Sequence, residues 1–230
     1  MVEMPEKHHS RISTTELAAF LKDVSSYDMS FSGTTRSCCI GIVDIVNSTA
    51  TTAKLTNGKM CRFYSIFLNA MSKILRSYDA TIIKNLGDSL LYYFPGTIDG
   101  KDRLAFAGAL DCALHTIELR GVINQIMSES SLPPIDFRIS CDYGIVSIAS
   151  SAKSSTEDMF GPTVNLCSKI NGAAGHNSLV IGGDMHQIVR SFKQYDYSRI
   201  GAYMLGLKLD YPVYTVTRTK SKWYKKSIKA

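Results

Sequence analysis

The segment that most constrains the fold is Cys38–Thr49, with the sequence CCIGIVDIVNST. Its apolar run, Ile40–Val43, is short and rich in β-branched residues, and it ends in Asp44 and a group of small polar residues. A run of this kind, bounded by turn-forming residues, predicts a buried strand over Ser37–Ile45. Asp44 stands where this strand ends, so we expect its carboxylate to face a cleft instead of the core.

A second acid interrupts the segment ATIIKNLGDSLLYYF, in which Gly87 and Asp88 separate two strand-like runs, Ala80–Leu86 and Ser89–Phe94. This pattern is typical of a hairpin. Asp44 and Asp88 then lie at equivalent ends of neighbouring strands. Taken alone, an aspartate at a strand end is most often a turn residue. Together the two carboxylates form a hard oxygen pair that suits Mg²⁺ or Mn²⁺ beneath a triphosphate.

Helical and strand-like segments alternate along the rest of the chain. Helices are expected after a Ser13 cap, over Lys59–Ser77, Asp102–Met127 and Gly161–Ala174, and over the short segment MHQIVRSF capped by Asp184. Strands are expected over Phe137–Cys141 and Ile145–Ala149, paired around Asp142–Gly144, and over Leu179–Ile181, Ala202–Leu207 and Val213–Thr217. Residues 30–37 are expected to form a linker and residues 150–158 a polar loop. The order predicts an α+β sandwich with helices packed on a mainly antiparallel sheet.

Composition points to an ordinary globular protein. The chain has 230 residues, of which 45% are hydrophobic and 20% charged, so one large domain can bury a full core. We find no apolar run near the roughly 20 residues that cross a membrane, and the segment MVEMPEKHHSR is too polar for a signal peptide. The six cysteines form no C-x-x-C pair and mostly lie in apolar patterns, which favours buried thiols in a reducing cytoplasm.

The net charge of +6 comes from the end of the chain. Residues 218–230 contain six basic side chains and no acidic one: Arg218, Lys220, Lys222, Lys225, Lys226 and Lys229. Without them, 20 basic residues face 20 acidic ones, so the body is neutral. We expect a solvated basic tail and no specific nucleic-acid binding; weak contact with an anionic membrane surface is the alternative.

Three ordered motifs carry a family resemblance: VDIVNST (43–49), KNLGD (84–88) and DMFGPTVNLCSK (158–169). With the segment FRISCDYGIVS before the third motif, they resemble the class III nucleotidyl cyclase catalytic domain from about Ser37 to Val216. The resemblance implies a ferredoxin-like sandwich that works as a head-to-tail homodimer with active sites at the interface. It divides the chain into an N-terminal extension (1–36), a catalytic domain (37–217) and the basic tail (218–230).

The resemblance also implies roles for individual residues. Asp44 and Asp88 would bind two Mg²⁺ or Mn²⁺ ions, together with the backbone carbonyl of Ile45. Lys84 and Asp158 match the pair that reads the purine in adenylyl cyclases, since a lysine donates to a ring nitrogen and a carboxylate accepts from the exocyclic amine. ATP is therefore the expected substrate, cyclised by attack of its 3′-hydroxyl on the α-phosphate.

Further residues of the expected site surround the sugar and the phosphates. Asn165 would orient the ribose, and Lys169 would stabilise charge on the transferring phosphate. Residues Asn47, Ser48 and Thr49 either let backbone N–H groups approach phosphate oxygens or cap a short helix. Near the C-terminus the family often has Lys-Gly in a triphosphate-binding strand; here Leu205-Gly206 stands there, with Lys208 as a substitute.

Lys169 stands where the family usually has arginine, and lysine lacks the planar fork that arginine offers to phosphate. Together with Leu205, this departure leaves open a catalytically weak or inactive regulatory dimer that senses nucleotides. A cyclase that prefers GTP or a pyrimidine nucleotide is another alternative, because Lys84 and Asp158 are only two determinants of a larger pocket. A third is an RNA-binding ferredoxin-like domain that uses the basic tail, although the chain lacks the aromatic strand signature that base stacking needs.

Overall fold

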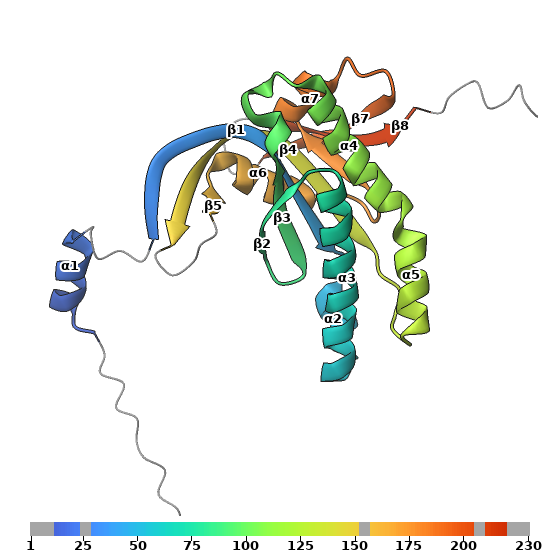
Figure 1. The fold of residues 1–230 in the computed structure, drawn as a ribbon, viewed down its shortest axis with the longest axis horizontal. Helices are drawn as coiled ribbons and strands as arrows, with labels where there is room; N and C mark the ends of the chain where they lie inside the picture. Colours follow the sequence, from blue (N-terminus) through green and yellow to red (C-terminus); the bar gives the residue numbers. More distant parts are fainter. Residues whose placement is uncertain (1–11, 24–28, 152–156, 205–209, 220–230) are drawn as a thin grey trace, which may run out of the picture.

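The computed structural model describes residues 12–23, 29–151, 157–204 and 210–219. Its eight-stranded sheet has the order β2-β3-β1-β4-β6-β8-β7, and β5 pairs with β4 off this path (Figure 1). The strands are β1 (Met29–Ile45), β2 (Thr81–Asn85), β3 (Ser89–Phe94), β4 (Phe137–Ser151), β5 (Glu157–Phe160), β6 (Leu179–Gly182), β7 (Tyr195–Met204) and β8 (Asp210–Arg218). Every pairing is antiparallel except that of β4 with β6, which confirms the predicted α+β sheet.

The described residues also form helices. They are α1 (Thr14–Lys22), α2 (Ser48–Thr52), α3 (Asn57–Ser77), α4 (Arg103–Glu118), α5 (Arg120–Glu129), α6 (Pro162–Asn171) and α7 (Gly183–Val189), with a 3₁₀ segment over Pro95–Gly100. Helix α1 has no buried residue and lies apart from the sheet in Figure 1. The predicted cap of α1 is confirmed, because the Ser13 hydroxyl accepts from the Glu16 N–H while the Glu16 carboxylate accepts from the Ser13 N–H. Among the described residues, no helix is long and apolar enough to span a membrane.

Strand β1 is central because its side chains alternate between two apolar cores. Cys39, Val43 and Ile45 belong to the larger core, which they share with α3, α4 and α5. Ile40 and Ile42 belong to the smaller core on the other side of the sheet, with α6 residues such as Cys167. This two-sided burial explains the unbroken apolar run. It also brings the last residues of β1 out at one end of the sheet.

The predicted linker over residues 30–37 is wrong: β1 starts at Met29 and pairs with β4 as far as Ser151. The register shifts between Phe31 and Thr35, where Gly33 has a positive φ of 70°. Serine, threonine and glycine suggested a loop, but threonine suits a strand and the glycine serves a bulge. The neighbouring β4 supplies the backbone partners that hold this polar segment extended.

The predicted strand pair around Asp142–Gly144 is also wrong, since β4 runs straight through it. The Asp142 side chain is buried, with 1% exposure, and accepts hydrogen bonds from the Tyr211 hydroxyl and the Tyr143 N–H. An Asp-x-Gly sequence resembles a turn only while the aspartate is assumed to face water. Here distant residues satisfy the carboxylate, and the strand continues.

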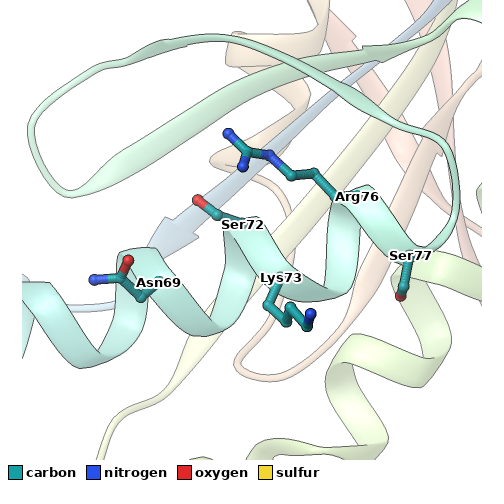
Figure 2. A pocket seen from close by; sticks show the side chains of 5 residues that line it. All are labelled: Asn69, Ser72, Lys73, Arg76 and Ser77. Carbon is teal, nitrogen blue, oxygen red and sulfur yellow. The ribbon is translucent and has the colours of Figure 1, made fainter.

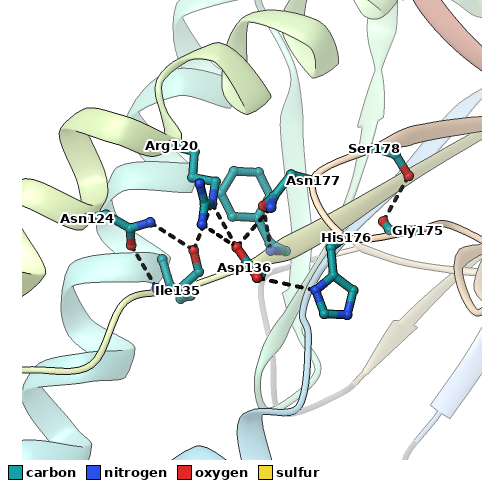
Figure 3. Close-up of polar contacts among 9 residues, drawn as sticks. Arg120, Asn124, Ile135, Asp136, Gly175, His176, Asn177 and Ser178 are labelled. Atoms are coloured by element: carbon teal, nitrogen blue, oxygen red, sulfur yellow. Dashed lines mark hydrogen bonds and ion pairs between the residues drawn. The ribbon is translucent and has the colours of Figure 1, made fainter.

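The long predicted helix is two helices, which meet at Leu119. Contacts of α5 explain why it forms a separate helix. Arg120 donates a hydrogen bond to the Ile135 carbonyl and pairs with Asp136, and the Asn124 side chain makes hydrogen bonds with the backbone of Ile135 (Figure 3). These contacts tie α5 to the segment that enters β4. No feature of the apolar spacing predicted this anchor.

Other boundaries differ less. Strand β4 extends to Ser151 and β5 begins at Glu157, so both strands enter the predicted loop over residues 150–158. Strand β7 starts seven residues before the predicted strand, at Tyr195 instead of Ala202. Asp184 lies in the first turn of α7, and Gly182 is the capping residue. The basic tail beyond residue 219 lies outside the described residues.

Candidate active site

The two predicted metal-binding carboxylates lie at the end of β1. Asp44 pairs across the sheet with Ser89 of β3, the residue that follows Asp88. Gly87 has a φ of 78°, which turns the chain between β2 and β3. The Ile45 N–H donates to the Asp88 backbone carbonyl over 3.3 Å, and the Ser48 hydroxyl donates to the Asp88 carboxylate. The hairpin turn is therefore fastened to the end of β1.

Arg138 of β4 lies opposite Asp44 on the other side of β1. Its Nε and one terminal nitrogen both lie 2.9 Å from Asp44 Oδ2. Burial raises the pKa of Asp44 above its ordinary value; the hydrogen bond from Arg138 opposes this effect, and the nearby Asp88 carboxylate adds to it. The site thus contains two interacting carboxylates and one internal cation.

This donor set fits a magnesium or manganese site. Within the described residues there is no cluster of three or more histidine, cysteine, aspartate or glutamate side chains. Mg²⁺ needs only one or two carboxylates, because it keeps several waters and takes substrate phosphate oxygens as further ligands. The repulsion between Asp44 and Asp88 is of the kind that a divalent cation relieves.

The loop after β1 lies beside the carboxylates. Asn47 has a left-handed φ of 55° and precedes α2, and its side chain makes no capping hydrogen bond. Ser48 is buried against Asp88, while Asn47 and Thr49 are exposed. Asn47 therefore occupies the capping position of α2, but its side chain does not cap the helix.

The predicted base-reading residues form a second cluster. Lys84 of β2 and Asp158 of β5 make an ion pair, with Lys84 Nζ 2.6 Å from Asp158 Oδ2. The other Asp158 oxygen accepts from the Met159 N–H over 2.8 Å, which orients the carboxylate. Below the ammonium lies the Phe160 ring, 5.0 Å away, and Phe160 meets Phe31 edge to face at 5.6 Å. Both charged groups are about one-third exposed or less, so they remain accessible to a ligand.

The remaining predicted residues lie on α6 or outside the described part. Asn165 and Lys169 are both exposed and four residues apart on α6, so they share a face. Within the described residues, no hydrogen bond or ion pair joins the Lys84–Asp158 pair to Asp44 or Asp88. Leu205, Gly206 and Lys208 lie outside the described residues.

Sequence reasoning missed Arg138 and the contact of Ser48 with Asp88. The register of β1 against β4 would have identified Arg138, because it is directly opposite Asp44. That register depends on reading β4 as one strand, and the apparent turn at Asp142 hid it.

Two other polar features are separate from these clusters. Asp136 pairs with Arg120 and accepts from His176 and Asn177 (Figure 3), and the hydrogen bond from Asn177, with those from Arg120 and His176, lowers its pKa. A cavity of about 410 Å³ lies along α3, lined by Asn69, Ser72, Lys73, Arg76 and Ser77 (Figure 2). None of the predicted site residues lines that cavity.

A family model and several solved structures match this chain. Residues 32–218 match the family model of the adenylate and guanylate cyclase catalytic domain. The adenylyl cyclase CyaB from P. aeruginosa is similar in structure, with a TM-score of 0.71 and 18% sequence identity, over 82% of this chain and 97% of that one.

Guanylyl cyclases are equally similar. Cya2 has a TM-score of 0.74 and 18% identity, over 83% of this chain and 96% of that one. The guanylate cyclase domain of RhGC from Catenaria anguillulae, in complex with GTP, has a TM-score of 0.69 and 17% identity, over 81% of this chain and 99% of that one. No curated protein matches the chain. The match over most of the chain shows that it belongs to the adenylate and guanylate cyclase catalytic domain family.

Proposed function

We propose that this protein is an adenylate cyclase, which converts ATP into 3′,5′-cyclic AMP and pyrophosphate as a homodimer. The observation that carries the choice of ATP is the pair of Lys84 and Asp158, held 2.6 Å apart. Adenine presents an acceptor at N1 beside a donor at its 6-amino group. The ammonium can donate to the first while the carboxylate accepts from the second.

Asp44, Asp88 and the carbonyl of Ile45 would hold two Mg²⁺ or Mn²⁺ ions. Bound there, the ions would polarise the 3′-hydroxyl and neutralise triphosphate charge. Ser48 orients Asp88 by donating to its carboxylate. Asn165 positions the ribose, and the backbone from Asn47 to Thr49 faces the phosphates.

The reaction is an intramolecular phosphoryl transfer. The 3′-hydroxyl gives its proton to solvent water and its oxygen bonds to the α-phosphorus, while the bond from that phosphorus to the bridging oxygen breaks and pyrophosphate leaves. Lys169 stabilises charge on the transferring phosphate, and Lys208 neutralises the departing oxygens. Positioning and charge neutralisation dominate catalysis of this kind.

The arrangement of the two clusters supports a homodimer. One chain contains both the carboxylates and the base-reading pair, and no hydrogen bond or ion pair joins them within the described residues. Two copies arranged head to tail can build two equivalent sites, each with carboxylates from one subunit and Lys84 and Asp158 from the other. One similar structure is itself described as a dimeric guanylyl cyclase domain.

Lys169 supports a second candidate, a regulatory dimer that binds nucleotide without turnover. Lysine keeps the positive charge but cannot hold a phosphate with two parallel hydrogen bonds. A different base preference is a variant of the first candidate, since Lys84 and Asp158 form only part of a base pocket.

One experiment separates these functions. Purified protein is incubated with each nucleoside triphosphate and Mg²⁺ or Mn²⁺, and products are identified by mass spectrometry. Cyclic AMP is expected from wild type and from Asp79→Asn, which changes an exposed turn aspartate. It should be absent with Asp44→Asn or Asp88→Asn. A different cyclic nucleotide would contradict the base assignment, and nucleotide binding without product would favour the regulatory dimer.

A further inference from the structure

We propose that Arg138 is an internal cation that competes with the divalent metal for Asp44, so that metal binding requires release of the guanidinium. The inference rests on the metal site of the proposed function. It adds a threshold: the free metal concentration must be high enough to displace a positive charge that the protein itself supplies.

The geometry makes this competition direct. Asp44 and Arg138 are cross-strand partners on β1 and β4, so their Cα atoms are fixed by the sheet. Both guanidinium contacts converge on the same oxygen, Asp44 Oδ2, at 2.9 Å. Asp44 is the more buried partner, with 17% side-chain exposure against 30% for Arg138. The carboxylate is therefore fixed in place, while the longer arginine side chain can turn towards solvent.

The charges at the site favour an exchange of cations. Asp44 interacts electrostatically with Asp88, which adds negative charge, and with Arg138, which offsets it. Within the described residues, Arg138 makes its ion pair with Asp44 and no other acid. A metal ion bound to Asp44 would repel a guanidinium held on the same carboxylate, because like charges at close range destabilise each other. Either cation can satisfy Asp44, but both together are unfavourable.

The size of the effect follows from linkage. If metal binds only to molecules in which Arg138 has released Asp44, the apparent dissociation constant is the intrinsic one divided by the released fraction. A partly buried ion pair of this geometry is favoured by about five- to tenfold over its open form. Removing the guanidinium should tighten metal binding by about the same factor.

The test measures Mn²⁺ binding without nucleotide, by electron paramagnetic resonance of the free ion, on the full chain. All variants are compared at the same pH and the same salt concentration. Arg138→Gln should bind Mn²⁺ about five- to tenfold more tightly than wild type. Arg138→Lys keeps the charge and should stay within about twofold of wild type.

Arg218→Gln is the matched control. It removes an arginine that is ion-paired with Asp111 at 2.6 Å and bonded to Glu118, on a different part of the sheet. Its Mn²⁺ affinity should equal that of wild type. A gain as large as that of Arg138→Gln would mean that net charge, not competition at Asp44, sets the affinity, and would overturn the proposal.

A second measurement uses unmodified protein, in case Arg138→Gln does not fold. Titration with Mg²⁺ should move the Arg138 Nε–H nuclear magnetic resonance signal from its ion-paired position towards that of a free arginine. The midpoint should coincide with metal binding. An unmoved signal at saturating Mg²⁺ would overturn the proposal.

The outcomes also separate this inference from the proposed function. If Asp44→Asn abolishes Mn²⁺ binding and Arg138→Gln binds no more tightly than wild type, the metal site stands and the competition is refuted. If no form of the protein shows Asp44-dependent Mn²⁺ binding, both the inference and the metal site fail.

Discussion

Replacing Asp142 by asparagine should remove a large pH dependence from the stability of this domain. Asp142 lies in the middle of β4 and is almost wholly buried. Burial raises its pKa from the ordinary value of 3.8 to about 7, against the effect of the Tyr211 hydrogen bond and of the Tyr143 and Met185 N–H groups. The folded protein therefore favours the protonated carboxyl, whereas the unfolded chain ionises at the ordinary value.

The sign and size follow from this difference. Between pH 3.8 and about 7 the folded state holds a proton that the unfolded state has lost, so stability falls as the pH rises through this interval. Each pH unit corresponds to about 1.4 kcal/mol, which gives about 4 kcal/mol over the whole interval. From pH 5 to pH 8 the expected loss at Asp142 is about 2.5 kcal/mol.

Asparagine suits the same position without ionising. Its carbonyl oxygen can accept from the Tyr143 and Met185 N–H groups, as Oδ1 does now. Its amide can donate to the Tyr211 oxygen, which Oδ2 now contacts at 2.9 Å. The stability of Asp142→Asn, minus that of wild type, should therefore rise by about 2.5 kcal/mol between pH 5 and pH 8.

The assay is urea unfolding followed by circular dichroism at closely spaced pH values, with Asp79→Asn as the control. Comparison at each pH cancels the titration of all other groups. A difference that stays constant from pH 5 to pH 8 would refute the reasoning, because it would mean that Asp142 has the same pKa in the folded and unfolded chains.

Three further changes test other parts of the structure. Gly41→Ala should lower stability by about 2–3 kcal/mol in urea unfolding, because the added methyl would lie 2.3 Å from the buried Tyr92 ring; an unchanged midpoint would contradict this packing. Asp136→Asn should cost about 1 kcal/mol at pH 7, and because the pKa of Asp136 is lowered in the folded protein, the cost should begin to shrink below pH 3.8 and vanish once the pH has fallen through the lowered value; a cost that does not shrink below pH 3.8 would argue against an ionic origin. Phe160→Leu should raise the KM for ATP about two- to fivefold in steady-state assays, since it removes the ring beneath Lys84, and Phe160→Tyr should restore it; equal KM values would exclude this role.

The parts of the fold that sequence predicted well are those where one local signal dominates. The apolar run Ile40–Val43 marked a buried strand, and the stripe of α3 marked a helix that contributes Phe63, Phe67 and Met71 to the core. The turn at Gly87 followed from the ease with which glycine adopts a positive φ. Each of these patterns depends on neighbours in sequence, and the tertiary contacts of this fold agree with it.

The wrong predictions concern segments whose structure depends on residues far away in the sequence. Asp142 resembled a turn residue because its hydrogen-bond partner, Tyr211, lies 69 positions away. The polar start of β1 is a strand because β4 pairs with it, and the break after Glu118 depends on contacts of α5 with the chain before β4. Arg138 was missed for the same reason, since only the strand register reveals it. The loop with Lys208 lies outside the described residues, so its role stays a prediction.

The pairing of β1 with β4 has a consequence for how the chain acquires its native state. Asp44 and Arg138 are 94 positions apart, and Met29 and Ser151, which pair at the other end of β1, have a larger separation in the sequence. Such long loops must close before the contacts that stabilise them can form, so a fold with these long-range pairings is slow to form. During synthesis, one edge of β1 therefore stays unpaired until β4 has left the ribosome. For that time the apolar residues of β1 are exposed to other chains. The two halves of the ion pair meet only when β4 has paired with β1.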